Sequence, residues 1–326
     1  MTARRMLYLN AGDLASLGLA FEDMFEPIAG AFRERARDAV VMPSMVWFPR
    51  RPQQWFHLVM SWIPSLKYAA AKFQSGDFTK TRTLPSVKGL VVLCDDATGD
   101  IVAIMDAGWI TGMRTAAASA LVAREQARRD SSTLAIFGCG LQARTHLPAF
   151  KAAVPGLERV RIFDRKPEGM ADYIAEMGGR HGVEIVAAHN VEELVRDADI
   201  VLSSATIMER DRRPVIHADW LKPGSLTVTI DWDSWITDDA IRAMDIVMTD
   251  DRTQFDGKRS AIGVFPAVDR IDADLGELLL SGKARRTRDD QRIMAFMLGV
   301  AIEDLATGVV LFERARTRGV GTWLPL

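Results

Sequence analysis

Short apolar runs alternate with amphipathic stretches between residues 134 and 250. Segments such as PEGMADYIAEMGGR (residues 167–180) and NVEELVRDAD (residues 190–199) have the pattern of surface helices. The apolar runs between such segments predict strands at Leu134–Phe137, Val160–Phe163, Glu184–Ala188, Ile200–Ser204, Leu226–Ile230 and Ile246–Met248. Strands joined by connections of helix length pair in parallel, because parallel neighbours need a long crossover. This part of the chain is therefore predicted to form a doubly wound α/β domain.

The segments on either side of this region have a different pattern. Between residues 39 and 105, strand-like runs follow one another through short turns that contain Pro or Gly, which predicts a mainly antiparallel sheet. Residues 111–130 (TGMRTAAASALVAREQARRD) then predict one long helix. The C-terminal residues 289–319 (DDQRIMAFMLGVAIEDLATGVVLFERARTRG) predict a second helical run with a break at Gly308.

Two domains are expected from the length of the chain. Its 326 residues are about twice the usual length of a single domain. If the C-terminal helical run folds back onto the first domain, residues 1–125 and 290–326 form one α+β domain. Residues 126–289 then form the doubly wound α/β domain, inserted between the two parts of the first.

Composition and charge exclude several classes of function. With 48% hydrophobic and 26% charged residues, the chain has the composition of an ordinary globular protein. A formal net charge of −2, without a dense run of Lys or Arg, gives no attraction to nucleic acid or anionic membranes. No apolar stretch reaches the roughly 18 residues that a membrane span needs, and Asn10 and Asp13 interrupt the N-terminal one. We therefore expect a cytoplasmic protein.

Cysteine and histidine spacing gives no indication of a disulfide framework or a metal site. Cys94 and Cys139 are far apart and belong to no CxxC pattern, which favours a reducing compartment. The five histidines show neither HxH nor HExxH spacing.

The run LAIFGCGLQARTHLPAF (residues 134–150) is the clearest candidate for a binding site. Gly138 and Gly140 follow a predicted strand and open a predicted helix, so the backbone amides can approach a pyrophosphate closely. Ala143 occupies the place of the third glycine, and Asp164 ends the next strand, where a carboxylate accepts hydrogen bonds from the adenosine ribose. The alternative is a tight turn without a ligand. Strand, helix start and acidic residue together favour a dinucleotide site.

Asp164 also bears on which dinucleotide binds. A carboxylate at this position repels a 2′-phosphate, which favours NAD over NADP. Arg165 and Lys166 follow directly and act against this preference, because a cation beside the ribose can accommodate the phosphate.

Three stretches resemble the ornithine cyclodeaminase/μ-crystallin family, which includes alanine dehydrogenases, ketimine reductases and related imino-acid reductases. They are DAGWITGMRTAAASALVARE (residues 106–125), IFGCGLQA (136–143) and GVAIEDLATGVVLFERA (299–315). The resemblance extends from about residue 40 to the C-terminus, and its most specific element is TxxRTAA followed by GxGxQA. It implies a homodimer, in which each chain has a substrate-binding and dimerisation domain and a Rossmann-type NAD-binding domain.

The resemblance implies roles for two basic residues. Arg114 matches the arginine that holds the substrate carboxylate, and a planar guanidinium suits this task because it forms two parallel hydrogen bonds. A solvated helix arginine is the alternative, but an arginine in the first turn of the predicted helix opposes the helix dipole, which favours the functional role. Lys72 matches a lysine that contacts the substrate carboxylate or carbonyl and takes part in catalysis. Lys67 is the fallback if the alignment is displaced.

Two aspartates are candidates for the acid/base. The resemblance places Asp233 on the aspartate proposed for this role. Asp231 lies one strand period earlier, so both side chains would lie on the same side of an extended segment. Two close carboxylates would raise one pKa. The alternative is a pair of turn aspartates that cap the next helix.

The chain departs from the family pattern at Met45, where the family has a second carboxylate-binding arginine. Either Arg50 or Arg51 takes its place, or the substrate lacks this contact. Ser86 falls where the family often has a threonine near the nicotinamide or the substrate; the alternative is an ordinary turn serine after proline. The full set of expected cofactor contacts is Gly138, Gly140, Leu141, Gln142, Ala143, Asp164, Arg165, Ser86, Thr115, Ala205 and Thr206; that of substrate contacts is Arg114, Lys72, Met45 and Arg50.

Tryptophans gather around the predicted site segments, at Trp47, Trp55, Trp62, Trp232 and Trp235. Most are expected to fill the core and the dimer interface. If even two of them line the pocket, the substrate is bulkier or less polar than ornithine or alanine.

Three functions remain open. The first is an NAD(H)-dependent oxidoreductase that interconverts an amino acid and its imino or 2-oxo acid by hydride transfer at the α-carbon. The second is a cyclodeaminase of ornithine or lysine, in which tightly held NAD takes and returns the hydride and ammonia leaves. The third is a cofactor-dependent binding protein. The missing second arginine and the tryptophans favour the first.

Overall fold

The computed structural model describes residues 4–79, 85–207 and 216–326, and the chain divides into two compact units. Unit 1 comprises residues 1–114 and 300–326, and unit 2 comprises residues 115–299. The first division falls inside helix α3 (Ala107–Gln126), earlier than the expected boundary between residues 125 and 126. Unit 2 is thus inserted into unit 1, and we describe each by itself.

Unit 1 is built on a mainly antiparallel sheet. Within the described residues, seven strands lie in the order β15-β1-β6-β5-β4-β3-β2, and the pair β1 and β6 is parallel. The long pairing of β3 with β4 and of β4 with β5 forms its centre. The strands are β1 (Arg5–Leu9), β2 (Val46–Arg51), β3 (Gln54–Ile63), β4 (Tyr68–Asp77), β5 (Val87–Asp95), β6 (Ile101–Asp106) and β15 (Thr322–Pro325). The first and last of these were not predicted.

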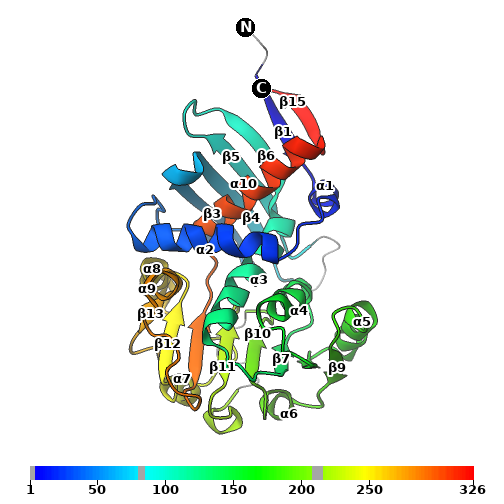
Figure 1. Cartoon of the computed structure of the whole chain (residues 1–326), viewed down its shortest axis with the longest axis vertical. Coiled ribbons are helices and arrows are strands. Elements are labelled where there is room, and N and C mark those ends of the chain that lie inside the picture. The colour runs from blue at the N-terminus through cyan, green and yellow to red at the C-terminus, as the bar shows by residue number, and fades with distance from the viewer. Residues whose placement is uncertain (1–3, 80–84, 208–215) are drawn as a thin grey trace. The chain divides into compact units, whose positions relative to one another are not determined.

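Helix α10 (Ala301–Arg318) covers one face of this sheet, where it packs against β3, β4 and β5 (Figure 1). Helix α2 (Glu22–Ala36) packs on α10 in turn. The predicted break at Gly308 is wrong, since α10 runs through it. A Cβ on Gly308 would lie 3.1 Å from Met105 Cε, so this glycine lets the helix approach the sheet closely. The remaining helices of unit 1 are α1 (Ala11–Ser16) and the 3-10 turn η1 (Pro64–Leu66).

The opposite face of the sheet is apolar and exposed. Alternation along β3 buries Val59 and Ser61 against α10, whereas Met60 (43% exposed) and Trp62 (37%) lie on the other side. Cross-strand pairing places Phe73 beside Leu90 on that side as well. We call this the uncovered face; it comprises Val46, Phe48, Met60, Trp62, Phe73 and Leu90, each more than a third exposed.

Unit 2 is a doubly wound α/β domain, as predicted. Its described residues form an eight-stranded sheet in the order β13-β12-β14-β11-β10-β7-β8-β9, with parallel neighbours. The six predicted strands are β7 (Thr133–Phe137), β8 (Arg159–Phe163), β9 (Glu184–Ala187), β10 (Ile200–Ser203), β11 (Leu226–Thr229) and β12 (Ile246–Thr249). The helices are α4 (Leu141–Ala153), α5 (Pro167–Met177), α6 (Val191–Val195), α7 (Asp238–Arg242), α8 (Arg252–Ile262) and α9 (Leu275–Ser281), with the 3-10 turn η3 (Ala218–Trp220).

Two strands of unit 2 were missed. One is the short β13 (Ala273–Asp274). The other is β14 (Ile293–Phe296), which lies between β11 and β12 and is fully buried, although the sequence predicted a helical run from residue 289. The pattern failed here because a strand buried on both faces is apolar throughout and has no alternation to distinguish it from a helix.

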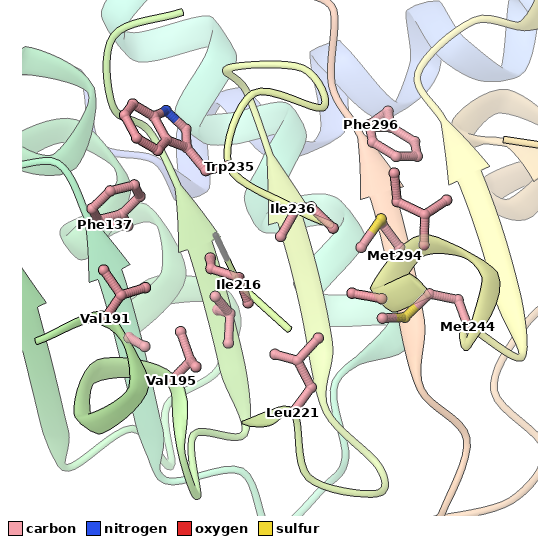
Figure 2. Packing of buried hydrophobic residues seen from close by; sticks show 14 of the residues in the cluster. Phe137, Val191, Val195, Ile216, Leu221, Trp235, Ile236, Met244, Met294 and Phe296 are labelled. Atoms are coloured by element: carbon pink, nitrogen blue, oxygen red, sulfur yellow. The ribbon is translucent and has the colours of Figure 1, made fainter. Parts of the chain in front are cut away.

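The core of unit 2 packs aromatic and aliphatic side chains against one face of this sheet (Figure 2). The indole of Trp235 is fully buried and meets the Phe137 ring edge to face, with ring centroids 4.9 Å apart. Trp235 therefore fills the core, as was expected of most of the tryptophans. No helix in the described residues combines the length and apolar character that crossing a membrane requires.

Candidate functional site

The turn between β7 and α4 needs glycine at two positions for different reasons. Gly138 has a φ of +92°, and a Cβ on it would lie 2.7 Å from Ala205 Cα. Its place is therefore fixed by backbone conformation and by the close approach of the turn that follows β10. Gly140 has an ordinary φ of −83°, and a Cβ on it would meet no atom within 4 Å. Gly140 instead leaves open space in front of the helix.

The start of α4 is suited to an anion. Gly140 is its N-cap and, having no side chain, gives the first turn no side-chain cap, so the backbone N–H groups of that turn are left for a ligand. The helix dipole adds a partial positive charge at the same place. Arg144, one turn later, donates to the carbonyls of Cys139 and Gly140, and its charge is paired with Glu176 (2.6 Å). Ala143 is fully buried, as its predicted role in packing the helix requires. This cradle fits a diphosphate.

Asp164 follows β8 and is tied to this turn. Its Oδ2 accepts a hydrogen bond from Cys139 N (2.9 Å), and its Oδ1 accepts one from Lys166 N (2.9 Å). Arg165, which was also expected to contact the cofactor, has its guanidinium over the Trp235 ring, 5.5 Å from the ring centroid. Burial and the Asp164 carboxylate raise the pKa of the Cys139 thiol to about 12, so Cys139 stays protonated and is a poor nucleophile.

The other expected cofactor contacts occupy varied positions. Leu141 is exposed on the first turn of α4, beside the half-buried Gln142. Ala205 and the exposed Thr206 follow β10, next to Gly138. Thr115 is buried in α3. Ser86 belongs to unit 1, where its carbonyl accepts a hydrogen bond from Asp77 N.

Asp231 and Asp233 lie in a turn after β11, and the expectation of an extended segment is wrong. Trp232 between them has a φ of +63°, so the two side chains leave the chain toward different partners. Asp231 Oδ2 accepts hydrogen bonds from Ser203 Oγ (2.8 Å) and Ala205 N (2.9 Å), whereas Asp233 Oδ2 accepts one from Phe265 N (3.1 Å). Neither caps α7, because Thr237 does so.

Asp231 has the properties of a group that exchanges protons near neutral pH. Its side chain is 1% exposed, and burial raises its pKa to about 7, with a smaller contribution from Asp233. The hydrogen bonds from Ser203 and Ala205 oppose this shift. The second oxygen, Oδ1, is buried and has no hydrogen-bond partner among the described residues.

Unit 1 contains a buried cluster of four charged side chains. Arg114 Nη1 lies 2.5 Å from Glu303 Oε2, and Arg114 Nε lies 3.1 Å from Asp304 Oδ1. Lys72 Nζ lies 2.6 Å from Asp304 Oδ2. All four side chains are at most 5% exposed. We call these residues the ionic cluster.

Arg114 is not in the first turn of its helix, contrary to the sequence prediction. Helix α3 begins at Ala107, because Asp106 Oδ1 accepts a hydrogen bond from Trp109 N (2.7 Å) and caps it there. The argument from the helix dipole therefore does not apply. What places Arg114 in the cluster is the charge of Glu303 and Asp304.

Burial shifts the pKa of one cation and of one carboxylate in the ionic cluster. It lowers the pKa of Lys72 to about 8; the charge of Arg114 adds to this shift and that of Asp304 opposes it. Burial likewise raises the pKa of Glu303, against the effect of Arg114. Glu303 Oε1 is buried without a hydrogen-bond partner in the part of the chain that the structure describes.

Polar neighbours extend the ionic cluster along β4. Thr111 Oγ1 accepts a hydrogen bond from Gln74 Nε2 (2.8 Å) and a long one from Lys72 Nζ (3.5 Å). Sequence reasoning assigned no role to Gln74, Thr111, Glu303 or Asp304. For the last two a signal was available: two adjacent acids stand in an otherwise apolar run, VAIEDLATGVV.

The structure does not bring the other predicted substrate residues into the cluster. Arg50 donates to Gln54, and its guanidinium lies over Phe56, on the uncovered side of the sheet and away from Lys72. Met45 is half-buried just before β2. The fallback Lys67 is exposed after η1. Among the described residues, no group of three or more His, Cys, Asp or Glu side chains is arranged to hold a metal ion.

Comparison with known proteins agrees with these features. Over 246 residues the chain is 34% identical to the Delta(1)-pyrroline-2-carboxylate reductase of Paracoccus denitrificans, covering 73% of this chain and 76% of that protein. Its fold superimposes on the Thermococcus litoralis Delta(1)-pyrroline-2-carboxylate reductase in complex with NADH and L-proline, with a TM-score of 0.88, 27% identity and coverage of 97% and 99%. An archaeal alanine dehydrogenase dimer with bound NAD has the same fold, with a TM-score of 0.87, 24% identity and coverage of 99% and 100%.

The family match extends over residues 13–319, which include the glycine turn, Asp231 and Asp233, and the whole ionic cluster. The chain belongs to the ornithine cyclodeaminase/mu-crystallin family.

Proposed function

We propose that the protein is an NAD(H)-dependent oxidoreductase that interconverts an amino acid and its imino or 2-oxo acid. The observation that carries this proposal is the placement of two buried cations, Lys72 and Arg114, on the shared carboxylate of Asp304 in unit 1, within a chain whose unit 2 has a dinucleotide turn. The Delta(1)-pyrroline-2-carboxylate reductases support it. The protein is an enzyme of amino-acid chemistry, and its cofactor is NAD.

The cofactor supplies the acceptor or donor of a hydride. In unit 2, the first turn of α4 binds its diphosphate through backbone N–H groups, and Gly140 keeps the space for it open. Asp164 accepts hydrogen bonds from the adenosine ribose, because its position after β8 is held by Cys139 N and Lys166 N.

The substrate carboxylate binds to Arg114 and Lys72. Two cations and two carboxylates make the ionic cluster neutral, so a bound carboxylate would add one uncompensated negative charge. Protonation of Glu303 would remove this excess, and burial, which raises the pKa of Glu303, makes that protonation easier. Glu303 thus adjusts the charge of the cluster to that of the substrate, while Asp304 holds both cations in place.

In unit 2, the turn after β11 offers two candidates for the acid/base of the reaction, Asp231 and Asp233. Asp231 has a pKa suited to this task, and Asp233 is the residue that the family resemblance indicates. The substitutions Asp231→Asn and Asp233→Asn distinguish them: loss of the basic or acidic limb of the pH–rate profile identifies the working carboxylate.

We also propose that the protein forms a homodimer through the uncovered face of unit 1. Six large apolar side chains there are more than a third exposed, which is an unusual concentration for a surface that meets only water. A second copy presents the same face and covers it by symmetry.

One assay tests the activity and separates it from a cyclodeaminase. The protein is incubated with NADH, ammonia and a panel of 2-oxo acids, and separately with ornithine or lysine and a catalytic amount of NAD⁺. We expect net loss of NADH with at least one 2-oxo acid. Ring closure of a diamino acid without net change in NADH would instead establish a cyclodeaminase. Binding of NADH without either reaction would favour a binding protein.

A further inference from the structure

Trp55 lies directly on the backbone of β4. A Cβ added to Gly76 would lie 2.0 Å from Trp55 Cε2, 2.3 Å from Cζ2 and 2.4 Å from Nε1. The indole therefore occupies the space above Gly76, and no other residue at position 76 allows this. The rings of His57 and Phe78 lie next to this indole, with centroids 5.7 Å and 6.5 Å from its own.

Trp55 and Trp47 lie on the same face of the sheet as the ionic cluster. Lys72 and Gln74 alternate onto one face of β4, and Gln74 is directly opposite His57 on β3. His57 in turn is opposite Trp47 on β2, and Trp55 is opposite Gly76. The row of Trp47 is thus one strand period from the row of Lys72, about 7 Å. The row of Trp55 lies one period further in the same direction.

A hollow of about 420 Å³ lies at this end of the sheet, lined by Trp47, by residues 49–54 and by Trp55. Its lining contains two indoles, two prolines, two arginines and two glutamines, and no carboxylate. The nearest acid in the strand pairing, Asp77, accepts hydrogen bonds from Gln54 and from Thr79. A substrate ammonium group would meet no opposite charge here, while a planar ring would meet flat aromatic surfaces.

We propose that Trp47 and Trp55 form the subsite for the substrate side chain, and that the preferred substrate is an amino, imino or 2-oxo acid with an aromatic side chain. This inference rests on the proposed function, which places the substrate carboxylate on Lys72 and Arg114. The row of Gln74 and His57, both buried, lies between that point and the row of Trp55, so the substrate side chain would reach the indoles past these two side chains. Gly76 is a specificity determinant because its missing side chain makes room for Trp55.

Binding of two simple acids tests the subsite without relying on turnover. With NADH present, calorimetry compares 3-phenylpropanoate with propanoate, which differ only by the phenyl ring. We expect the phenyl compound to bind roughly tenfold or more tightly, because the ring is buried between aromatic surfaces. Trp55→Ala and Gly76→Ala should each remove most of this difference.

Matched variants separate the subsite from general effects. Trp323→Ala removes a tryptophan from β15 of the same unit, and Gly30→Ala adds a methyl group where no atom lies within 4 Å; both should keep the tenfold difference. Equal binding of the two acids by the unmodified protein, or a difference that persists in both Trp55→Ala and Gly76→Ala, overturns the proposal.

The turnover assay distinguishes failure of the subsite from failure of the function. Reduction of pyruvate with ammonia at least as efficiently as phenylpyruvate would leave the oxidoreductase intact and overturn the aromatic preference. Selective binding of 3-phenylpropanoate without any NADH oxidation would support the subsite and contradict the oxidoreductase.

Discussion

Arg114 is held by two carboxylates, and this sets what its removal should cost. In Arg114→Ala the buried Glu303 and Asp304 lose a partner, and the substrate carboxylate loses its guanidinium. We expect kcat/KM to fall by the equivalent of about 2–5 kcal/mol and the free energy of unfolding to fall by about 3–5 kcal/mol. Affinity for NADH should stay the same, because the cofactor turn belongs to unit 2. Kinetics, denaturant unfolding and NADH titration measure the three quantities.

A double variant separates the two roles of this arginine. Adding Glu303→Gln to Arg114→Ala removes one uncompensated charge, so part of the stability should return while the activity does not. Arg114→Lys should recover a part of the activity, since a point charge cannot form the two-pronged pair. Full activity in Arg114→Ala would contradict the assignment.

Lys72 predicts how carboxylate binding depends on pH. Only its protonated form attracts a carboxylate, and burial lowers its pKa to about 8. Affinity for propanoate should therefore decrease as the pH rises through about 8, and Lys72→Arg should abolish this decrease because arginine keeps its charge. Calorimetry from pH 6 to pH 10 provides the measurement; constant affinity in the unmodified protein up to pH 10 would contradict it.

The lowered pKa of Lys72 also makes the free energy of unfolding depend on pH, in the opposite direction to carboxylate binding. The folded pKa of Lys72 lies below the value of 10.5 for a free lysine, so folding disfavours the charged form. The resulting penalty is fully present below about pH 8 and is relieved as the pH rises toward 10.5. Binding and stability should thus change in opposite directions over this range.

The sequence indicated the basic half of the ionic cluster and not the acidic half. Arg114 and Lys72 stood out because their surroundings are small and apolar and because they match a known pattern. Glu303 and Asp304 lie in the first turn of α10, where acids usually stabilise a helix and face water. Their pairing with residues about 190 and 230 positions earlier in the chain is a property of the fold, and local patterns carry no trace of it.

At the scale of elements, the two glycines of the β7–α4 turn give a matched test. Gly140→Ala adds a methyl group where no protein atom lies within 4 Å, so the fold should persist. The methyl group would fill space that the diphosphate needs, and we expect NADH affinity to fall at least tenfold, about 1.4 kcal/mol. Gly257→Ala in α8 also meets no atom and should change nothing.

Gly138→Ala should behave differently, because the added methyl group would strain the backbone and collide with protein atoms even without a ligand. A side chain there requires a φ of +92° and meets Ala205 at 2.7 Å, so the variant should lose stability before any ligand is added. NADH titration and thermal unfolding of the three variants measure these effects. Unchanged NADH affinity in Gly140→Ala would contradict a diphosphate at this turn.

Asp164, which follows β8, predicts which of the two dinucleotides binds more tightly. Asp164 should accept hydrogen bonds from the ribose diol and repel a 2′-phosphate, so NADH should bind more tightly than NADPH. Asp164→Ser should narrow or reverse this preference, as fluorescence titration with both cofactors would show. Tighter binding of NADPH by the unmodified protein would make Arg165 the determinant instead.

Helices and strands with a clear hydrophobic periodicity were predicted well, and those without such a periodicity were not. The six strands of unit 2 that alternate with amphipathic helices were found within one or two residues. The sequence pattern predicts one helical run over the residues of β14 and α10, because Ile293–Phe296 and the start of α10 are both apolar. Gly308 was read as a helix break, but its role is decided by Met105 and Val91 on the sheet beneath it, which only the packing reveals.

At the scale of the whole molecule, the uncovered face predicts the oligomeric state. Phe73 is 49% exposed near the middle of that face, between β3 and β5. Phe73→Asp places a charge in the proposed interface and should yield a monomer, whereas Trp323→Asp on β15 should remain a dimer. Sedimentation at micromolar concentration measures both. A monomeric unmodified protein would contradict the proposal.

The insertion of unit 2 into unit 1 has a consequence for synthesis on the ribosome. Residues 115–299 emerge as one continuous stretch and can fold as a unit while the chain is still growing. At that stage Lys72 and Arg114 already exist, but Glu303 and Asp304 have not been translated. The nascent first segment therefore has two cations without their counter-charges and a sheet that α10 does not yet cover. The ionic cluster is therefore completed only after α10 has been made.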